Sequence, residues 1–327
     1  MAVQGLQEFS SVAEIPSFAG ASGIGVIGGV AYLRPSGAAP FPLGGPLAGI
    51  GATVRTVDAA LSTEINAIYA TIQDAVDAAL AGDTIQIAAG AYDETVTIPR
   101  TDANGDALNN LTLVGIGGRG AVYIEPSTED AAGMLVHADD VTLINVGVAA
   151  EDETAGNFAL TVTGTRFRAY QCKIEGAASQ VVIGPGTIAQ EAAGTRGRGA
   201  DSLFLDCEFC WGTNGITFTS SDYGACTQAK VIGCLFHNLT GDEIDENDVG
   251  VIGAVRDAWI VGNVLANQED GTEPTKFVDL DSAGSTGVIA QNIIANPTNA
   301  SAQIGIAAGV IYVANLTEAG VTTARPS

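Results

Sequence analysis

The feature that most constrains this chain is a short apolar phrase that returns eight times, at intervals of 23 to 35 residues. In LTLVGIGG, LFLDCEFC and WIVGNVLA, for example, an apolar stretch stops at a Gly, Cys or Asn. Aligned on the stopping residue, the phrases give the column Gly115, Asn145, Cys172, Cys207, Cys234, Asn263, Asn292 and Asn315. Residues two and four positions earlier are mostly apolar, and this period-2 alternation is typical of β-strands. A motif that recurs at a long, irregular period predicts a solenoid whose coils are joined by loops of variable length.

If each repeat forms one coil, the members of the column stack about 4.8 Å apart. Asn suits such a stack because its amide donates to one neighbour and accepts from the next while its backbone turns sharply. Cys is compact and tolerates burial, so we interpret the cysteines as stacked side chains rather than as reactive thiols. The predicted structural ladder consists of Asn145, Cys172, Cys207, Cys234, Asn263, Asn292 and Asn315.

The segment TIQDAVDAALAGDTIQIAAGAYDETVTIP, residues 71–99, precedes the whole ladder. Thr71 is predicted to cap a helix through IQDAVDAALA that Gly82 ends, and two strands around a glycine turn are expected to follow. A short amphipathic helix at this point would cover the open apolar end of a solenoid.

This segment resembles the entry to right-handed parallel β-helix proteins of the pectin-lyase-like kind. The matching residues are Ile72, Ala75, Val76, Ala78, Ala79, Gly82, Asp83, Thr84, Ile85, Gly90, Tyr92, Glu94 and Ile98. Together with the ladder, the resemblance covers roughly residues 70–317. It implies an all-β fold: a right-handed parallel β-helix solenoid of about eight rungs, with a short N-terminal capping helix and an extended N-terminal arm. The fold by itself implies little about function.

The first 57 residues differ in composition from the rest of the chain. They hold 11 of the 42 glycines and 5 of the 11 prolines and have no net charge, whereas the whole chain carries −24. We expect a docking arm at 1–57, a capping helix and first strands at 58–99, a parallel β-helix at 100–318 and a C-terminal tail at 319–327. The apolar residues of the arm that need a partner surface are Phe41, Leu43, Leu47 and Ile50. The alternative is that the arm folds back on its own β-helix.

Charge and cysteine content exclude several classes of function. A net charge of −24 disfavours binding to nucleic acid or to an anionic membrane. No stretch reaches the roughly 18 apolar residues of a membrane span, and the N-terminus lacks the basic start of a secretory signal. The five cysteines are an odd number, which disfavours a disulfide framework. Cys207 and Cys210 lie three apart on a strand and so point to opposite faces, which disfavours zinc.

Few residues suggest chemistry. Asp102, Asn104 and Asp106 have the spacing of a calcium loop without its Gly and Glu, so an ordinary turn is favoured over bound Ca²⁺ and no cofactor is expected. The acidic segment 240–250 could bind a cation or cleave a glycoside, but such a run in one loop is usually a solvated face. The loop at 186–202 carries Arg196 and Arg198, which could bind carboxylates of a neighbouring subunit or could simply be solvated. Two histidines and two tryptophans are interpreted as ordinary packing or surface residues, and these are His137, His237, Trp211 and Trp259.

β-Helix domains with an N-terminal arm resemble phage head-decoration proteins and short tailspikes. This resemblance implies a non-catalytic capsid decoration (cement) protein on the virion surface, attached through its arm. The expected partners are two further copies in a homotrimer and another virion protein such as the major capsid protein. The alternatives are a tailspike or polysaccharide-active β-helix enzyme, such as a depolymerase or lyase, and a glycan-binding adhesin without catalysis. Pectate lyases and pectinesterases use sets of Asp, Arg and Lys that the sequence does not place here.

Overall fold

The structure is a computed structural model. It describes residues 23–27, 30–34, 41–43, 53–58, 68–127, 132–150, 158–176, 179–183, 200–212, 214–219, 227–239, 244–247, 255–266, 278–280, 284–295, 304–306, 308–317 and 320–322. Among these residues, no helix is long and apolar enough to span a membrane.

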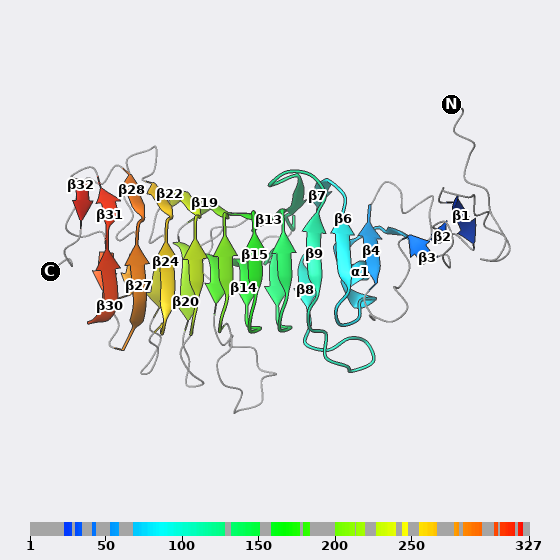
Figure 1. Cartoon of the computed structure of the whole chain (residues 1–327), viewed down its shortest axis with the longest axis horizontal. Coiled ribbons are helices and arrows are strands. Elements are labelled where there is room, and N and C mark those ends of the chain that lie inside the picture. Colours follow the sequence, from blue (N-terminus) through cyan, green and yellow to red (C-terminus); the bar gives the residue numbers. More distant parts are fainter. Residues whose placement is uncertain are drawn as a thin grey trace.

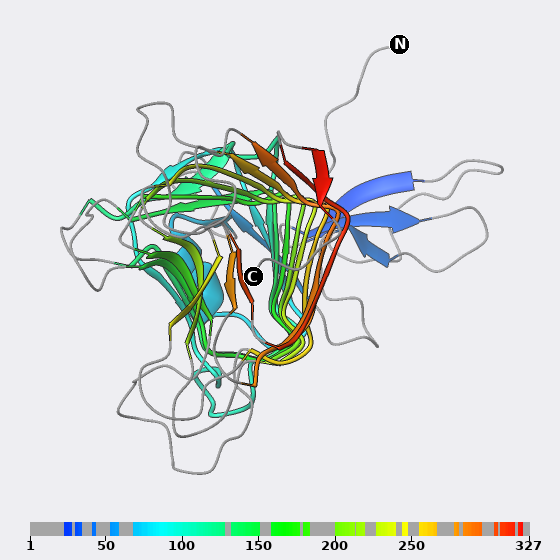
Figure 2. The same ribbon diagram turned by 90° about the vertical axis from the view of Figure 1, so that its left-hand side faces the viewer.

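The described strands form three long sheets that wind around one interior, seen side-on in Figure 1 and along the long axis in Figure 2. The 11-stranded sheet contains, in spatial order, β5 (Ile68–Tyr69), β4 (Val54–Val57), β6 (Thr84–Ile87), β9 (Thr112–Gly115), β12 (Thr142–Ile144), β15 (Arg168–Tyr170), β18 (Leu203–Leu205), β21 (Lys230–Ile232), β24 (Ala258–Val261), β27 (Thr286–Ala290) and β30 (Gly309–Val313). The 10-stranded sheet contains β7 (Gly90–Tyr92), β10 (Val122–Ile124), β13 (Val146–Ala149), β16 (Lys173–Glu175), β19 (Glu208–Gly212), β22 (Leu235–Leu239), β25 (Val264–Ala266), β28 (Ile293–Ala295), β31 (Asn315–Thr317) and β32 (Gly320–Thr322). The 8-stranded sheet contains β8 (Val96–Ile98), β11 (Met134–Val136), β14 (Phe158–Val162), β17 (Ser179–Ile183), β20 (Asn214–Thr219), β23 (Ile244–Asn247), β26 (Val278–Leu280) and β29 (Ile304–Ile306).

Each coil of the chain visits the 11-stranded, the 10-stranded and then the 8-stranded sheet, as β6, β7 and β8 do. Neighbouring coils pair in parallel, for example β12 with β15 and β15 with β18. This arrangement is a parallel β-helix. The segment 84–98, expected to form two strands, forms three because every coil has two corners between its three strands.

The interior is filled by the inward residue of each strand, because alternate side chains point to opposite faces of a sheet. Its largest side chains include a run of phenylalanines from successive coils, in which the Phe209 and Phe236 rings stack with centroids 4.5 Å apart. Burying each aromatic ring of this size contributes about 2–3 kcal/mol to the free energy of folding.

The only α-helix among the described residues is α1 (Ile72–Asp77), which is shorter than expected. Thr71 caps it by accepting a hydrogen bond from Asp74 N at 3.1 Å. Glu94, on the connection to β8, accepts hydrogen bonds from Ile72 N at 2.7 Å and Gln73 N at 2.9 Å. These bonds satisfy three donors that a helix leaves unpaired at its start. The helix packs against β4, β5, β6 and β8.

The N-terminal boundary differs from the expected one at residue 57. Strand β4 (Val54–Val57) pairs with β6 and belongs to the 11-stranded sheet. Earlier in the chain, β1 (Gly23–Ile27), β2 (Val30–Arg34) and β3 (Phe41–Leu43) pair antiparallel in a small separate sheet. The front of the chain is therefore not simply an extended arm. At the C-terminal end, β32 lies within the expected tail at 319–327 and pairs antiparallel with β31, the last strand of the expected β-helix.

Candidate functional site

The six strands β15, β18, β21, β24, β27 and β30 of the 11-stranded sheet each end at a sharp corner, where the predicted ladder lies. Tyr170, Leu205, Ile232, Val261, Ala290 and Val313 pair in register across successive strands. Two positions after them, the structure brings one buried file together: Cys172, Cys207, Cys234, Asn263, Asn292 and Asn315. The position between is left-handed even where the residue is not glycine, as at Gln171 (φ 54°) and Gln291 (φ 57°).

The asparagines of this file are linked by hydrogen bonds. Asn263 Nδ2 donates to Asn292 Oδ1 at 2.9 Å, and Asn292 Nδ2 donates to Asn315 Oδ1 at 2.8 Å. Each Oδ1 also accepts from the backbone N of the preceding coil, so that Cys234 N donates to Asn263 Oδ1 at 2.8 Å. The file is thus a structural stack, with its thiols buried in the interior.

The prediction for Asn145 is wrong. Ile144 pairs with Tyr170, so Asn145 is equivalent to Gln171 and adopts the left-handed turn conformation, with φ 55°. Val146 occupies the ladder position instead and is fully buried. Gly115 is displaced in the same way, because Val114 pairs with Ile144. The alignment slips because the last two strand residues, such as Leu143 and Ile144, are both apolar although they point to opposite faces, so their hydrophobicity does not distinguish inward from outward.

The residues with calcium-loop spacing form a closed turn. Asp102 Oδ1 accepts hydrogen bonds from Asn104 N at 2.8 Å and Asp106 N at 2.9 Å. These bonds lower the pKa of the Asp102 carboxyl, against a raising effect of desolvation. The carboxylate therefore orders an ordinary turn, which the sequence favours, and bound Ca²⁺ stays the untested alternative.

The remaining sequence candidates are only partly described. Phe41 and Leu43 lie in β3, whereas Leu47 and Ile50 fall outside the described residues. Arg196 and Arg198 also lie outside them. The acidic segment 240–250 is not wholly a loop, because Ile244–Asn247 forms strand β23 of the 8-stranded sheet.

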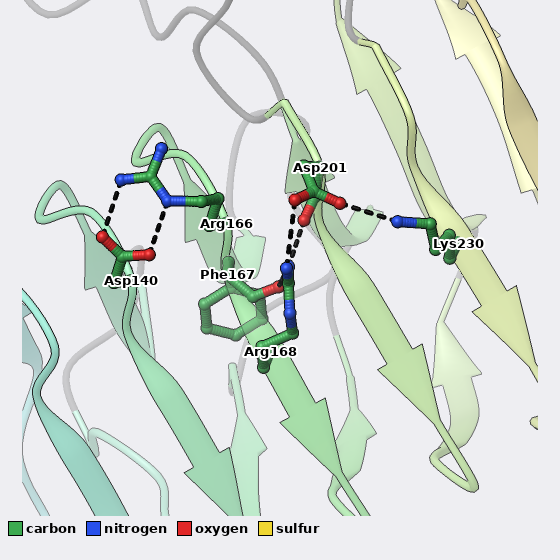
Figure 3. A network of polar contacts seen from close by, with 6 residues as sticks. All are labelled: Asp140, Arg166, Phe167, Arg168, Asp201 and Lys230. Carbon is green, nitrogen blue, oxygen red and sulfur yellow. Dashed lines mark hydrogen bonds and ion pairs between the residues drawn. The ribbon is translucent and has the colours of Figure 1, made fainter.

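A column of charged side chains lies at the opposite end of the 11-stranded sheet, where its strands begin (Figure 3). Arg166 Nε and Nη2 donate to the two carboxylate oxygens of Asp140 at 2.5 and 2.6 Å. Asp201 accepts from Arg168 Nη2 at 3.1 Å and from Lys230 Nζ at 2.7 Å. Each charged side chain of this column is paired with one of opposite charge, so the column stabilises the corner and is not a candidate reactive site.

A second polar cluster has more reactive chemistry and lies on the outward face of the 10-stranded sheet. Glu175 on β16, Cys210 on β19 and His237 on β22 are adjacent in register. Two residues earlier on each strand, at the next outward-facing position, Lys173 pairs with Glu208. The residues between them, Ile174, Phe209 and Phe236, point into the core, which sets the cluster on the outside of the coil.

The side chains of this cluster are in mutual contact. Cys210 Sγ lies 3.5 Å from Glu175 Oε2 and 3.8 Å from Glu208 Oε1. His237 Nε2 lies 3.3 Å from Glu208 Oε1, and Arg119 Nη1 lies 3.5 Å from Glu208 Oε2. Lys173 forms an ion pair with Glu175. Two carboxylates, a thiol and an imidazole therefore share one small site with two cations.

Burial affects the protonation of the cluster. Desolvation raises the pKa of the Glu175 carboxyl, the Cys210 hydrogen bond opposes this, and the charge of Glu208 adds to it. Desolvation also raises the pKa of the Cys210 thiol, against the charge of Lys173. A carboxyl that retains its proton more readily than usual is suited to acid/base chemistry, and perturbed groups of this kind gather at functional sites.

Trp211 follows Cys210 directly and is 57% exposed. It adopts a left-handed conformation with φ 60°, at a corner where the preceding and following coils place Gly176 and Asn238. Gly and Asn tolerate this conformation, whereas a bulky residue there costs about 1–2 kcal/mol. A tryptophan in a strained, exposed position beside a carboxylate cluster favours a binding role, since its flat face suits the stacking of a planar or ring-shaped ligand.

The cluster also offers metal ligands. Within the described residues, Glu208, Cys210 and His237 each present one ligand atom, and these atoms lie within 4.8 Å of one another. Oxygen, sulfur and nitrogen donors together suit a divalent transition metal.

Sequence reasoning misses this cluster, although a signal for it exists. Glu175, Cys210 and His237 each stand three residues after a ladder cysteine, at Cys172, Cys207 and Cys234. Once the ladder is aligned, equal offsets place the three side chains next to one another. The other histidine, His137, lies elsewhere, with Nδ1 2.9 Å from Thr163 Oγ1.

The comparisons with known proteins agree on the fold. No family model and no curated protein matches the chain. Solved structures do match: pectin methylesterase from Aspergillus niger has 17% identity, covers 80% of this chain and 85% of its own, and gives a TM-score of 0.53. Pectin methylesterase PemA from Erwinia chrysanthemi has 14% identity over 84% of this chain and 91% of its own, with a TM-score of 0.53. Pectate lyase Pel9A has 13% identity over 82% of this chain and 70% of its own, with a TM-score of 0.56.

The chain therefore has the right-handed parallel β-helix fold of pectin-lyase-like proteins, as the sequence predicts. At these identities, the likeness establishes the fold, and the function has to be argued from the site.

Proposed function

We propose that the protein is a polysaccharide-active β-helix enzyme that binds a glycan over the outward face of the 10-stranded sheet. The observation that carries this proposal is the convergence of Glu175 and Glu208 on one thiol, next to the exposed Trp211. The similar structures, named as pectin methylesterases and a pectate lyase, support a polysaccharide as substrate.

The residues of the cluster divide into three roles. Glu175, whose side chain is 22% exposed, supplies the acid/base group. Glu208 is held by Arg119 and His237 and provides the second carboxylate, as acid-catalysed cleavage of a sugar linkage requires. Trp211 positions the glycan by stacking.

The charge of the protein favours a neutral glycan over a polyanionic one. The chain carries −24, and the two cations of the cluster, Lys173 and Arg119, are already paired with its glutamates. A uronic-acid polymer would meet net repulsion on approach. The proposed substrate class therefore differs from pectin itself.

The test is a reducing-sugar assay against a panel of neutral and acidic polysaccharides. Glu175→Gln should lower the rate at least about 100-fold, the usual loss on removing an acid/base group. Glu125→Gln, an exposed glutamate outside the cluster, is the matched control and should leave the rate unchanged. Equal rates in Glu175→Gln and wild type would contradict the assignment, as would a wild type that cleaves no glycan of the panel.

A second candidate is a structural protein on the surface of a phage particle, and an exposed apolar patch favours it. The patch lies near the C-terminal end of the coil, on outward positions of the 11-stranded sheet, and contains Trp259, Ile311 and Val313, each between 45% and 58% exposed. The outward positions of β24, β27 and β30 carry no charge, so second copies can meet there without repulsion between like charges. In this reading the patch joins the copies of a homotrimer, and residues 1–57 attach it to a virion protein such as the major capsid protein.

Sedimentation equilibrium separates the second candidate from the first. A wild type that is trimeric, and that becomes monomeric in the Ile311→Asp variant, supports assembly. Deletion of residues 1–52, which leaves strand β4 in place, should then abolish binding to the capsid. A monomeric wild type would contradict it.

A further inference from the structure

We propose that Glu208, Cys210 and His237 bind a divalent transition-metal ion of the Zn²⁺ type. The three residues come from the neighbouring strands β19 and β22, and all face outward from the coil. The proposal concerns the same face as the proposed function but does not depend on it, because an ion can bind whether or not a glycan is cleaved.

The distances within the trio are close to those of a coordination shell. Ligand atoms at about 2.0–2.3 Å from a tetrahedral ion are separated by roughly 3.3–3.8 Å. Glu208 Oε1 already lies 3.3 Å from His237 Nε2 and 3.8 Å from Cys210 Sγ. The thiol and the imidazole complete the triangle within 4.8 Å, so that only a small side-chain movement closes it around an ion.

The surrounding groups hold the trio in place. Arg119 lies 3.5 Å from Glu208 Oε2 and so leaves Oε1 to face the thiol and the imidazole. Such partners fix the orientation of a metal ligand. The rigid ladder lies directly before each strand, because Cys207 and Cys234 precede β19 and β22 by one residue.

The donor set selects the kind of ion. Thiolate and imidazole ligands favour zinc and similar ions over Ca²⁺ or Mg²⁺, which prefer oxygen. Three protein ligands leave a fourth position for water, which is typical of sites that take part in chemistry.

On binding, the ion replaces the thiol proton, so that Cys210–SH and M²⁺ give Cys210–S–M⁺ and one H⁺ released to solvent. The two carboxylates are balanced by Arg119 and Lys173 beforehand, so the loaded cluster gains one positive charge.

The test uses Co²⁺ as an optical probe on the full-length chain, together with Zn²⁺ calorimetry in two buffers of different ionisation enthalpy. We expect one ion per chain, a near-ultraviolet sulfur-to-cobalt band and release of one proton. Cys210→Ser should remove the band, and His237→Gln should weaken binding at least about tenfold.

Matched controls use the same residue types elsewhere. His137→Gln and Cys172→Ala should bind as wild type, because these side chains lie outside the cluster and Cys172 precedes β16, which carries none of the three ligands. Glu175→Gln should retain the ion while losing glycan cleavage, which separates failure of this proposal from failure of the proposed function. A wild type without the band, or an undiminished band in both Cys210→Ser and His237→Gln, would overturn the proposal. Circular dichroism shows whether each variant is folded.

Discussion

The two ends of the strands of the 11-stranded sheet carry two polar columns built in different ways. Where the strands begin, Asp140, Arg166, Arg168, Asp201 and Lys230 form ion pairs at the surface (Figure 3). Where the strands end, neutral amides and thiols form the buried ladder. Both corners turn through left-handed residues, at Asp140 and Gln171 for example. Both columns therefore stabilise a left-handed turn between strands. One does so with exposed ion pairs and the other with buried neutral groups.

The difference shows which kind of polar contact stabilises a coil. Arg166 and Asp140 are 47% and 28% exposed, and solvent screens ion pairs of this type. Asn263, Asn292 and Asn315 are fully buried, so each unmade hydrogen bond leaves a desolvated group behind. We expect the buried column to dominate stability and to be insensitive to salt.

The largest effect is expected for Asn263→Leu. It removes the acceptor of Cys234 N and the donors to Asn292 Oδ1 and Val231 O. Leaving a buried backbone donor unpaired lowers the free energy of unfolding by about 1–3 kcal/mol. Chemical denaturation measures this loss, and a variant as stable as wild type would show that the amide stack contributes nothing net.

A smaller effect is expected for Cys207→Ala, in the thiol half of the same file. Cys207 Sγ lies 3.5 Å from Ala169 O, whereas Asn263 Nδ2 lies 3.0 Å from the equivalent Val231 O. The weaker contact and the small cavity left behind predict a loss of about 1 kcal/mol. A loss as large as that of Asn263→Leu would mean that thiols and amides contribute alike.

The sequence predicts the coil but not the orientation of its strands. The recurring phrase and its fixed offset are sufficient for a parallel β-helix, because stacked coils impose them. Asn145 is misplaced because Leu143 and Ile144 are both apolar, and only the pairing of Ile144 with Tyr170 shows which of them points outward. Strand β4 escapes prediction because it lies in a Gly- and Pro-rich stretch without net charge, whose composition suggests an arm.

The carboxylate cluster could not be found from local sequence. Glu208 and Cys210 are near in the chain, but Arg119 reaches them from a distant loop and His237 from the next coil. Their proximity follows from the superposition of coils, so it becomes visible only after the ladder is aligned correctly. The sequence argument against zinc was that Cys207 and Cys210 point to opposite faces, and in the structure Cys207 lies in the buried ladder. Cys210 lies instead beside Glu208 and His237, two other potential ligands.

Cys234→Asn should sharpen the comparison within the ladder. An amide here would reach Asn263 Oδ1, and Phe204 O already lies 3.6 Å from Cys234 Sγ. Extending the amide stack by one coil should stabilise the fold by up to about 1 kcal/mol, the net value of a buried hydrogen bond. Denaturant midpoints measure the change. A loss of stability would show that this coil has no room for the larger side chain.

The smallest effect is expected for Arg166→Gln in the exposed column, a loss of about 0.5 kcal/mol at neutral pH. The hydrogen bond from Arg166 lowers the pKa of the Asp140 carboxyl below its ordinary value of 3.8. A carboxyl with a depressed pKa contributes stability above its ordinary pKa and loses it as the pH falls through the folded value. The difference between wild type and Arg166→Gln should therefore be complete at pH 6, shrink below pH 3.8 and also shrink in concentrated salt. The deficit of Asn263→Leu should respond to neither condition, because no charge is involved. A difference for Arg166→Gln that persists in high salt and at low pH would show that packing of the arginine, rather than its ion pair, stabilises this corner.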